Sequence, residues 1–345
     1  MTLHCAFIGF GKSTTRYHLP YVLHRKDRWQ VAHIYRRRAK PEEQAPQYSH
    51  IHFTSDLDEV LNDPLVKLVV VCTHADSHFE YAKKALEAGK NVLVEKPFTP
   101  TLEEAKTLFA LANSKGLTVT PYQNRRFDSC FLTTKKVIES GKLGELVEIE
   151  SHFDNYRPLA ETNPGGPQNG EFYGLGVHTL DQIISLFGRP DHVSYDLRSL
   201  CNKANPDDTF EAQLFYGDMK AIVKTSHLVQ IDYPKFIVHG HKGSFVKYGI
   251  DQQETSLKAN VMPGEPGFGA DDSVGELVYV NEAGEMVREA VPLESGDYGR
   301  VYDALYDTLV NGQPNYVKET DVLTNMEILQ RGFEQPSPAT ITLTR

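Results

Sequence analysis

Glycines and small polar residues follow a short apolar segment near the start of the chain. Residues 3–8 are too few for a helix and run into Gly9-Phe10-Gly11-Lys12-Ser13-Thr14, which predicts a buried strand that ends in a tight turn. A helix is expected from Thr15 to Leu23. In such a unit the first glycine permits the turn, the second lets the backbone approach a pyrophosphate, and the helix N-terminus faces that anion. We therefore expect phosphate contacts from Gly9, Gly11, Lys12, Ser13 and Thr14.

Three consecutive arginines follow the next apolar segment. Residues 30–35 predict a second strand, and Arg36-Arg37-Arg38 come directly after it. In dinucleotide folds this position meets the adenosine ribose, where an acidic residue suits NAD and an arginine suits the 2′-phosphate of NADP. No acidic residue occurs before Glu42. Arg36 and Arg37 therefore predict a preference for NADP(H) over NAD(H), and the alternative is a solvated basic loop.

The same glycine turn also resembles the end of a P-loop, which would indicate a phosphoryl-transfer NTPase. A P-loop needs a glycine five residues before Gly11, but residue 6 is alanine. The predicted strand also runs through that position. We keep an NTPase only as an alternative to a dinucleotide-binding enzyme.

Predicted strands and helices alternate up to about residue 120. Further strands are expected at 51–53, 68–72, 91–94 and 117–120, and helices at 56–61 with a cap near Ser55, at 78–88 and at 102–115. This alternation predicts a doubly wound parallel sheet, in which ligands bind at the carboxyl ends of the strands. Gly9, Arg36, Thr73 and Lys96 all follow predicted strands.

Composition is that of a soluble globular protein with about two domains. The chain has 345 residues, 40% of them hydrophobic and 24% charged, and a net charge of −10, which argues against nucleic acid as a partner. No run approaches about 18 apolar residues, so no membrane span is expected. Four scattered cysteines and the lack of a leader predict reduced thiols and a cytoplasmic location.

Several motifs, taken in order, resemble the glucose–fructose oxidoreductase and inositol dehydrogenase family (Gfo/Idh/MocA). They are Gly9-Phe10-Gly11, Val71-Cys72-Thr73 with His78, Ala88-Gly89-Lys90-Asn91-Val92, Glu95-Lys96-Pro97, Tyr122-Gln123-Asn124-Arg125-Arg126, Gly141 to Leu146, Tyr156-Arg157-Pro158, Gly176-Val177-His178-Thr179-Leu180-Asp181 and the helix from Tyr298 to Val310. The resemblance covers nearly the whole chain. It is nearest to the bacterial branch that contains scyllo-inositol dehydrogenases.

The resemblance implies a Rossmann domain over residues 1–121 and a substrate-binding and oligomerisation domain over residues 122–345. The second domain would be built on a large, open, mostly antiparallel sheet. Expected strands at 146–153, 193–197, 210–216, 221–226, 235–239, 277–280 and 286–291 agree with this, because no helices of equal length separate them. In the family the open face often pairs with another subunit, so a homodimer or homotetramer is implied.

The resemblance also implies an enzyme that moves a hydride between a nicotinamide and the hydroxyl or carbonyl carbon of a sugar, cyclitol or similar polyol. Lys96 matches the family's lysine, which bonds the reacting oxygen and relays its proton. His178 matches a histidine that donates or accepts a proton in many members. We expect Thr73, His78, Glu95 and Lys96 to help hold the cofactor, and a cis bond at Pro97.

One position departs from the family. Many members have an aspartate four residues before the histidine, and this chain has Gly174 there. Tyr173, Asp154 or Tyr156 are candidates to replace it. If nothing replaces the carboxylate, the protein would instead be a weakly active or inactive NADP(H)-binding sensor.

Other polar residues are expected to contact the substrate or to form the wall of its site: Asn124, Arg125, Tyr156, Arg157, Tyr173 and Asp181. Asp181 would orient His178 or cap its helix. Cys72, His74 and His78 include zinc-ligand types, but their spacing fits no usual zinc pattern. No metal is expected.

Overall fold

The chain divides into two compact units and passes between them several times. In the computed structural model, which describes residues 1–159, 163–334 and 336–338, the first unit comprises Met1–Asn124, Ser256–Phe268 and Tyr298–Leu323. The second comprises Arg125–Thr255, Gly269–Asp297 and the chain from Thr324. A single boundary after residue 121 was predicted from the sequence, without the two later segments of the first unit.

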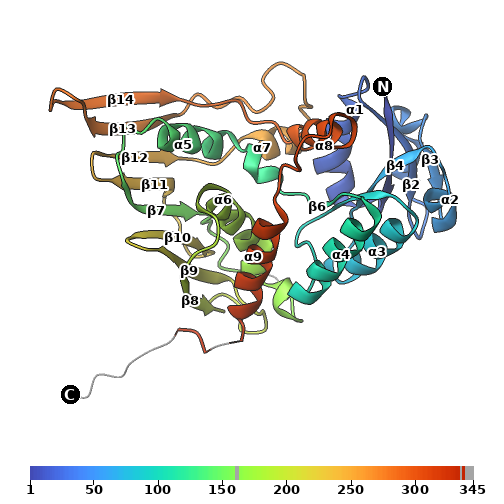
Figure 1. Cartoon of the computed structure of the whole chain (residues 1–345), viewed down its shortest axis with the longest axis horizontal. Coiled ribbons are helices and arrows are strands. Elements are labelled where there is room, and N and C mark those ends of the chain that lie inside the picture. Colours follow the sequence, from blue (N-terminus) through green and yellow to red (C-terminus); the bar gives the residue numbers. More distant parts are fainter. Residues whose placement is uncertain (160–162, 335, 339–345) are drawn as a thin grey trace. The chain divides into compact units, whose positions relative to one another are not determined.

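Six parallel strands form the sheet of the first unit, in the order β3-β2-β1-β4-β5-β6 (Figure 1). This is the doubly wound order of dinucleotide-binding folds, and the predicted Rossmann class is confirmed. Each expected strand is present within two residues of its predicted bounds. The strands are β1 (Leu3–Ile8), β2 (Trp29–Tyr35), β3 (His52–Thr54), β4 (Val66–Val71), β5 (Asn91–Val94) and β6 (Val119–Pro121).

The helices of the first unit begin and end where local chemistry dictates. Those between residues 1 and 124 are α1 (Leu19–Leu23), α2 (Leu57–Leu61), α3 (His78–Glu87) and α4 (Leu102–Lys115). In α4 a capping box joins Thr101 and Glu104, and Gly116 ends the helix in the left-handed region. In α2 the cap is Asp56, whose Oδ1 accepts a bond from the Asp58 N–H at 2.9 Å. The cap predicted near Ser55 is therefore one residue too early.

The helix expected after the glycine turn is broken in two. A π-helical turn, Thr14–His18, precedes the short α1. Pro20 has no N–H, so it cannot donate the next bond of a regular α-helix. The wide turn accommodates this loss, and π turns often mark functional positions.

Residues 298–323 return to the first unit through α8 (Arg300–Asn311). The Trp29 Nε1–H donates to the Tyr302 carbonyl at 3.0 Å. Arg25 donates to both carboxylate oxygens of Asp303, at 3.0 and 2.9 Å. These contacts join α8 to the segment from α1 to β2.

The second unit is built on an eight-stranded sheet in the order β14-β13-β12-β11-β7-β10-β9-β8. Only β7 and β10 pair in parallel, and every other neighbouring pair is antiparallel. The predicted open, mostly antiparallel sheet is confirmed, but β12 was not predicted. The strands are β7 (Leu146–His152), β8 (His192–Arg198), β9 (Thr209–Tyr216), β10 (Met219–Ser226), β11 (Pro234–Gly240), β12 (Gly243–Tyr248), β13 (Val274–Val280) and β14 (Met286–Pro292).

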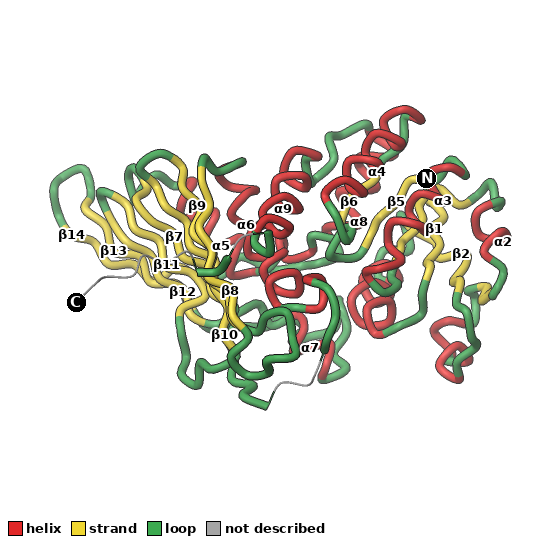
Figure 2. Tube along the Cα trace, turned by 90° about the horizontal axis from the view of Figure 1, so that it is seen from below, coloured by secondary structure: helices red, strands yellow, loops and turns green. Residues whose placement is uncertain are grey.

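Helices cover one face of this sheet (Figures 1 and 2). Helix α5 (Ser129–Glu139) packs on β11 and β12, and α6 (Val177–Phe187) packs on β10. Cys130, Phe131 and Phe236 form a buried cluster between α5 and the sheet. The remaining helices, α7 (Gln253–Lys258) and α9 (Glu319–Arg331), contain points where the chain crosses between units.

All four cysteines are free thiols, three of them buried. Within the described part of the chain, no helix is both long and apolar enough to cross a membrane.

The pair between Arg25 and Asp303 yields a test of how α8 stabilises the first unit. Asp303→Asn should lower the free energy of unfolding by about 1–3 kcal/mol, because it leaves a mostly buried guanidinium without its counter-charge. Urea unfolding followed by Trp29, the chain's single tryptophan, would measure this change. Asp307→Asn on the same helix alters only an exposed bond donated by Asn311 and should change stability by less than about 0.5 kcal/mol. Equal effects of the two variants would contradict the assignment.

Candidate functional site

The turn after β1 requires glycine at position 9. Gly9 has φ +111°, and a Cβ there would lie 2.5 Å from the carbonyl oxygen of Cys72. A Cβ at Gly11 would meet nothing within 4 Å among the described residues, so the backbone there is open to a ligand. Thr14, which stands where a third glycine would be expected, is buried and donates through Oγ1 to the Gly9 carbonyl at 2.9 Å. Thr14 therefore closes the turn.

A cleft of about 1150 Å³ lies over this turn, at the carboxyl ends of β1, β2 and β4. It is lined by Gly9, Phe10, Gly11, Lys12, Ser13, Tyr35, Arg36, Arg37, Arg38, Lys40, Cys72, Thr73, His74, Asp76, Ser77 and Tyr81. The structure thus brings together most of the residues expected to bind phosphate and adenosine ribose. Backbone N–H groups and arginines at one cleft suit a dinucleotide.

The three arginines of this cleft differ in their surroundings. Arg36 donates to both carboxylate oxygens of Glu43, at 2.7 and 3.0 Å. The hydrogen bond from Arg36 lowers the pKa of Glu43 below its usual range, and the Lys40 N–H also donates to this carboxylate at 2.8 Å. Arg37 and Arg38 are exposed. Arg36 therefore holds the loop after β2 in place, while its neighbours present charge to the cleft.

Glu95, at the end of β5, lies at the centre of a buried polar network. His18 Nε2 is 3.0 Å from Glu95 Oε1, and Ser13 Oγ donates to the same oxygen. The Lys96 N–H donates to Oε2 at 2.9 Å, and the other His18 nitrogen is 2.7 Å from the Tyr302 hydroxyl. Burial alone would raise the pKa of Glu95, but the bonds from His18 and Ser13, with the charges of His18 and Lys96, lower it to about 2. Glu95 is therefore ionised and fixes the backbone of Lys96.

A second clamp holds the segment after Lys96. The peptide bond between Lys96 and Pro97 is cis, as expected from the resemblance. His78 is buried, with Nδ1 2.8 Å from the Pro97 carbonyl oxygen and Nε2 3.1 Å from that of Thr73. Burial lowers the pKa of His78, and a neutral imidazole donates to one of these carbonyls at a time. With both nitrogens so placed, we assign His78 to positioning the loop that carries Thr73.

His178 lies in the first turn of α6 in the second unit and is buried. Asp181 accepts two bonds from the Arg126 guanidinium, both at 2.8 Å. The Gln182 amide donates to the Arg125 carbonyl at 2.7 Å, and the Asn325 amide donates to that of Val177 at 2.9 Å. The first turns of α6 are thus held by three sets of hydrogen bonds. Asp181 helps to hold the helix through its ion pair with Arg126.

The other residues expected to contact substrate have varied surroundings. Arg125 is buried, pairs with Asp128 at 3.3 Å and with Glu254 at 3.1 Å, and lies 4.8 Å from the centre of the Phe153 ring. Tyr156 and Arg157 are exposed. Burial raises the pKa of Tyr173 well above its usual range. Asn124 is buried at the end of the first unit's first segment.

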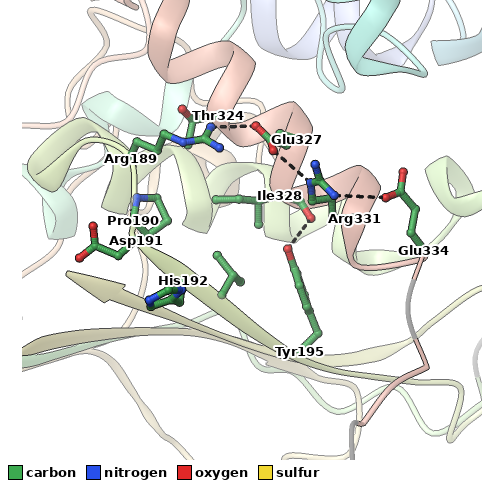
Figure 3. A pocket seen from close by; sticks show the side chains of 11 residues that line it. Arg189, Pro190, Asp191, His192, Tyr195, Thr324, Glu327, Ile328, Arg331 and Glu334 are labelled. Atoms are coloured by element: carbon green, nitrogen blue, oxygen red, sulfur yellow. Dashed lines mark hydrogen bonds and ion pairs between the residues drawn. The ribbon is translucent and has the colours of Figure 1, made fainter. Parts of the chain in front are cut away.

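A further hollow of about 400 Å³ lies between the start of β8 and α9 (Figure 3). Its charged side chains pair with one another. Arg189 and Arg331 both bond the Glu327 carboxylate, at 2.8 and 3.0 Å, and the hydrogen bond from Arg189 is the main cause of a lowered pKa of Glu327. Tyr195 donates to the Ile328 carbonyl at 3.2 Å. These contacts join α9 to the edge strand β8. We therefore assign the polar side chains of this hollow to holding the two elements together.

Sequence reasoning missed several residues that complete the sites. His18 belongs to no motif, and Tyr302, in the helix expected from Tyr298 to Val310, lies 284 positions away, so no local signal indicates their contact. Glu43 carried a weak signal, because an acid seven residues after Arg36 is within reach across a short loop. Among the described residues no three metal-ligating side chains lie close enough together to hold an ion.

The parallel strand order, the glycine turn and the cleft above it define a dinucleotide-binding protein. Residues 3–123 match a family described as "Oxidoreductase family, NAD-binding Rossmann fold", and residues 135–342 match "Oxidoreductase family, C-terminal alpha/beta domain". The chain belongs to the Gfo/Idh/MocA family of oxidoreductases and is a dehydrogenase or reductase.

Relatives agree over the full chain. "Uncharacterized oxidoreductase YhhX" of Escherichia coli (strain K12) is 83% identical over 345 residues, which is all of both chains. A crystal structure of a probable oxidoreductase yhhX has a TM-score of 0.97 at 82% identity and full coverage of both chains. The "scyllo-inositol 2-dehydrogenase (NADP(+)) IolW" of Bacillus subtilis (strain 168) is 32% identical over 338 residues, 96% of this chain and 93% of that protein.

The Glu95 network predicts a specific dependence of stability on pH. Because the pKa of Glu95 falls from 4.5 to about 2 on folding, its ionised form contributes fully above about pH 4.5, and this contribution is lost as pH falls toward 2. Glu95→Gln should therefore reduce the free energy of unfolding by roughly 2–4 kcal/mol at pH 7, and by less than half as much at pH 3. Urea unfolding of both proteins at the two pH values tests this. Glu103→Gln, at an exposed position of α4, is the control, and a pH-independent difference for Glu95→Gln would contradict the assignment.

Proposed function

We propose that the protein is an NADP(H)-preferring dehydrogenase or reductase of a sugar, cyclitol or similar polyol. The observation that carries this proposal is the placement of Lys96. The residue follows β5, and its backbone is bound by the ionised Glu95, which also bonds Ser13 of the glycine turn. One buried carboxylate therefore ties the candidate acid–base residue to the phosphate-binding turn. The name of the B. subtilis relative, scyllo-inositol 2-dehydrogenase (NADP(+)), supports the choice of cofactor and substrate class.

The chain's residues divide the work of such a reaction. Gly9, Gly11 and the N-terminus of the following π turn would hold the pyrophosphate, and Arg37 with Arg38 the adenosine end. When bound, the nicotinamide supplies hydride acceptance or donation. The Lys96 amine hydrogen-bonds the reacting oxygen and takes or returns its proton, which requires the neutral amine in one direction and the ammonium in the other. We also assign proton transfer to His178, whose helix the Arg126–Asp181 pair keeps in place.

We propose in addition that the open face of the eight-stranded sheet pairs with another copy of the chain as a homodimer or homotetramer. Exposed apolar residues on this face, including Tyr248, Val280 and Met286, support this. The free cysteines support the cytoplasm as the compartment.

Nucleotide binding is the first test. Calorimetry with NADP⁺, NADPH, NAD⁺ and NADH should show binding, tightest for the phosphorylated pair, and the absence of any binding would refute the proposal. Turnover of scyllo-inositol or another polyol with NADP⁺ should follow. Tight NADPH binding without turnover across a broad polyol and sugar panel would instead establish the sensor that Gly174 suggested.

Arg37→Ala should separate the two cofactors. It should weaken NADPH binding about 10–100-fold, because a charge-assisted bond to the 2′-phosphate is worth about 1.5–3 kcal/mol, and NADH binding less than about twofold. Arg36→Ala should weaken both, because it removes the counter-charge of the buried Glu43 carboxylate and loosens the loop. Calorimetric titration of each variant with each cofactor measures this. An equal loss of NADH and NADPH affinity in Arg37→Ala would overturn the NADP(H) assignment.

Lys96→Met should separate chemistry from binding. We expect kcat to fall about 10²–10⁴-fold, the usual range for loss of an acid–base group, with the Kd for NADPH changed less than about threefold. Lys106→Met, at an exposed position of α4, is the matched control and should retain full activity. Steady-state kinetics with calorimetry decide the outcome, and a kcat for Lys96→Met within tenfold of the parent would exclude Lys96 as the acid–base residue.

A further inference from the structure

A carboxylate lies beside Gly174, although position 174 itself has none. Gly174 is part of a π-helical turn, Phe172–Gly176, that continues directly into α6. A Cβ at position 174 would lie 3.3 Å from Oε2 of Glu171 and 3.9 Å from its Cδ. The Glu171 side chain is therefore folded over the space that a side chain at position 174 would enter.

A buried histidine lies next to the same carboxylate. His227, just after β10, is 5% exposed, and its Nε2 is 3.5 Å from Glu171 Oε1. Among the described residues neither ring nitrogen of His227 has a hydrogen-bond partner. Burying a polar ring without a partner is costly, and Glu171 is the acceptor toward which a small shift would bring it. His227 and the face of Gly174 thus confine the Glu171 carboxylate from two sides.

The backbone around Glu171 is also fixed. The Phe172 N–H donates to Asp207 Oδ2 at 2.8 Å, and the Glu171 N–H donates to the Asp207 carbonyl at 3.4 Å. The Gly174 N–H donates to the Gly170 carbonyl at 2.9 Å. Burial, with the charges of Glu171 and Asp208, raises the pKa of Asp207 to about 7. Asp207 and Asp208 are buried, whereas Glu171 is partly exposed. Water can therefore stabilise the charge of Glu171.

We propose that Glu171 is a positioning residue for His178, with His227 orienting its carboxylate. Residues one helical turn apart have Cβ atoms about 5–6 Å from each other, and His178 follows Gly174 by four residues. The Glu171 carboxylate, 3.3 Å from the Cβ position of residue 174, thus lies beside the turn that precedes His178, and a negative charge near an imidazole favours its protonated form. The proposal rests on the proposed function only in assigning proton transfer to His178. Glycine at 174 then provides room for Glu171.

Histidine resonances test this without turnover. In the full-length protein with ¹³C-labelled histidine rings, the pH midpoint of His178, identified by its absence in His178→Asn, should fall by about one pH unit in Glu171→Gln. The double variant Glu171→Ala with Gly174→Asp should restore at least half of the shift, because it places a carboxylate on the same helix face. Asp207→Asn removes the titration of Asp207. It should leave the pH midpoint of His178 unchanged. Glu139→Gln, an exposed position of α5, is the matched control.

A kinetic comparison completes the test, with scyllo-inositol and NADP⁺ as the probes. Glu171→Gln should lower kcat about 10-fold with the KM for NADP⁺ unchanged, and the double variant should recover most of that loss. The proposal is overturned if the His178 midpoint is the same in Glu171→Gln and the parent, or if the double variant behaves like Glu171→Ala alone. Absence of NADPH binding or of turnover in the parent would refute the proposed function, and the resonance comparison would still decide the role of Glu171.

Discussion

The burial of one negative charge, on Glu95, constrains much of the first unit. An unpaired carboxylate in a protein interior costs several kcal/mol, and the cost is offset only when hydrogen bonds and opposite charges surround it. Here the partners come from the π turn after β1, from the backbone of Lys96 and, through His18, from α8. Three segments far apart in the sequence must therefore meet for the charge to be tolerated. This explains why residues 298–323 belong to the first unit, although they follow most of the second.

The same constraint links structure to chemistry. A lysine that relays a proton must be held near its reacting partner while its amine stays free to change charge. In this chain the carboxylate of Glu95 bonds the main chain of Lys96, and the His78 clamp holds the next residue, Pro97. The backbone of Lys96 is therefore fixed from both sides by the fold.

Local patterns in the sequence predicted what depends on neighbouring residues. Buried strands such as β4 read as continuous β-branched runs, and α4 carries its own capping box and terminal glycine, so both were predicted within two residues. The strand β12 was missed because its alternation is weak and a glycine begins it. Two other contacts depend on the tertiary fold and not on neighbouring residues. They are the pairs of Arg36 with Glu43 and of His18 with Tyr302. Residue types alone indicated where the dinucleotide would bind, but only the fold showed which arginine is available to it.

Each of the two departures from the expected motifs has a polar side chain close by in the structure. Thr14 stands where a third glycine was expected, and its hydroxyl closes the turn by bonding the Gly9 carbonyl. Gly174 stands where a carboxylate was expected, and the Glu171 carboxylate lies over it. The Thr14 hydroxyl belongs to the departing residue itself, whereas the carboxylate beside Gly174 comes from three residues earlier in the chain. On the proposed role of Glu171, the family motif specifies where a carboxylate lies more strictly than which residue supplies it.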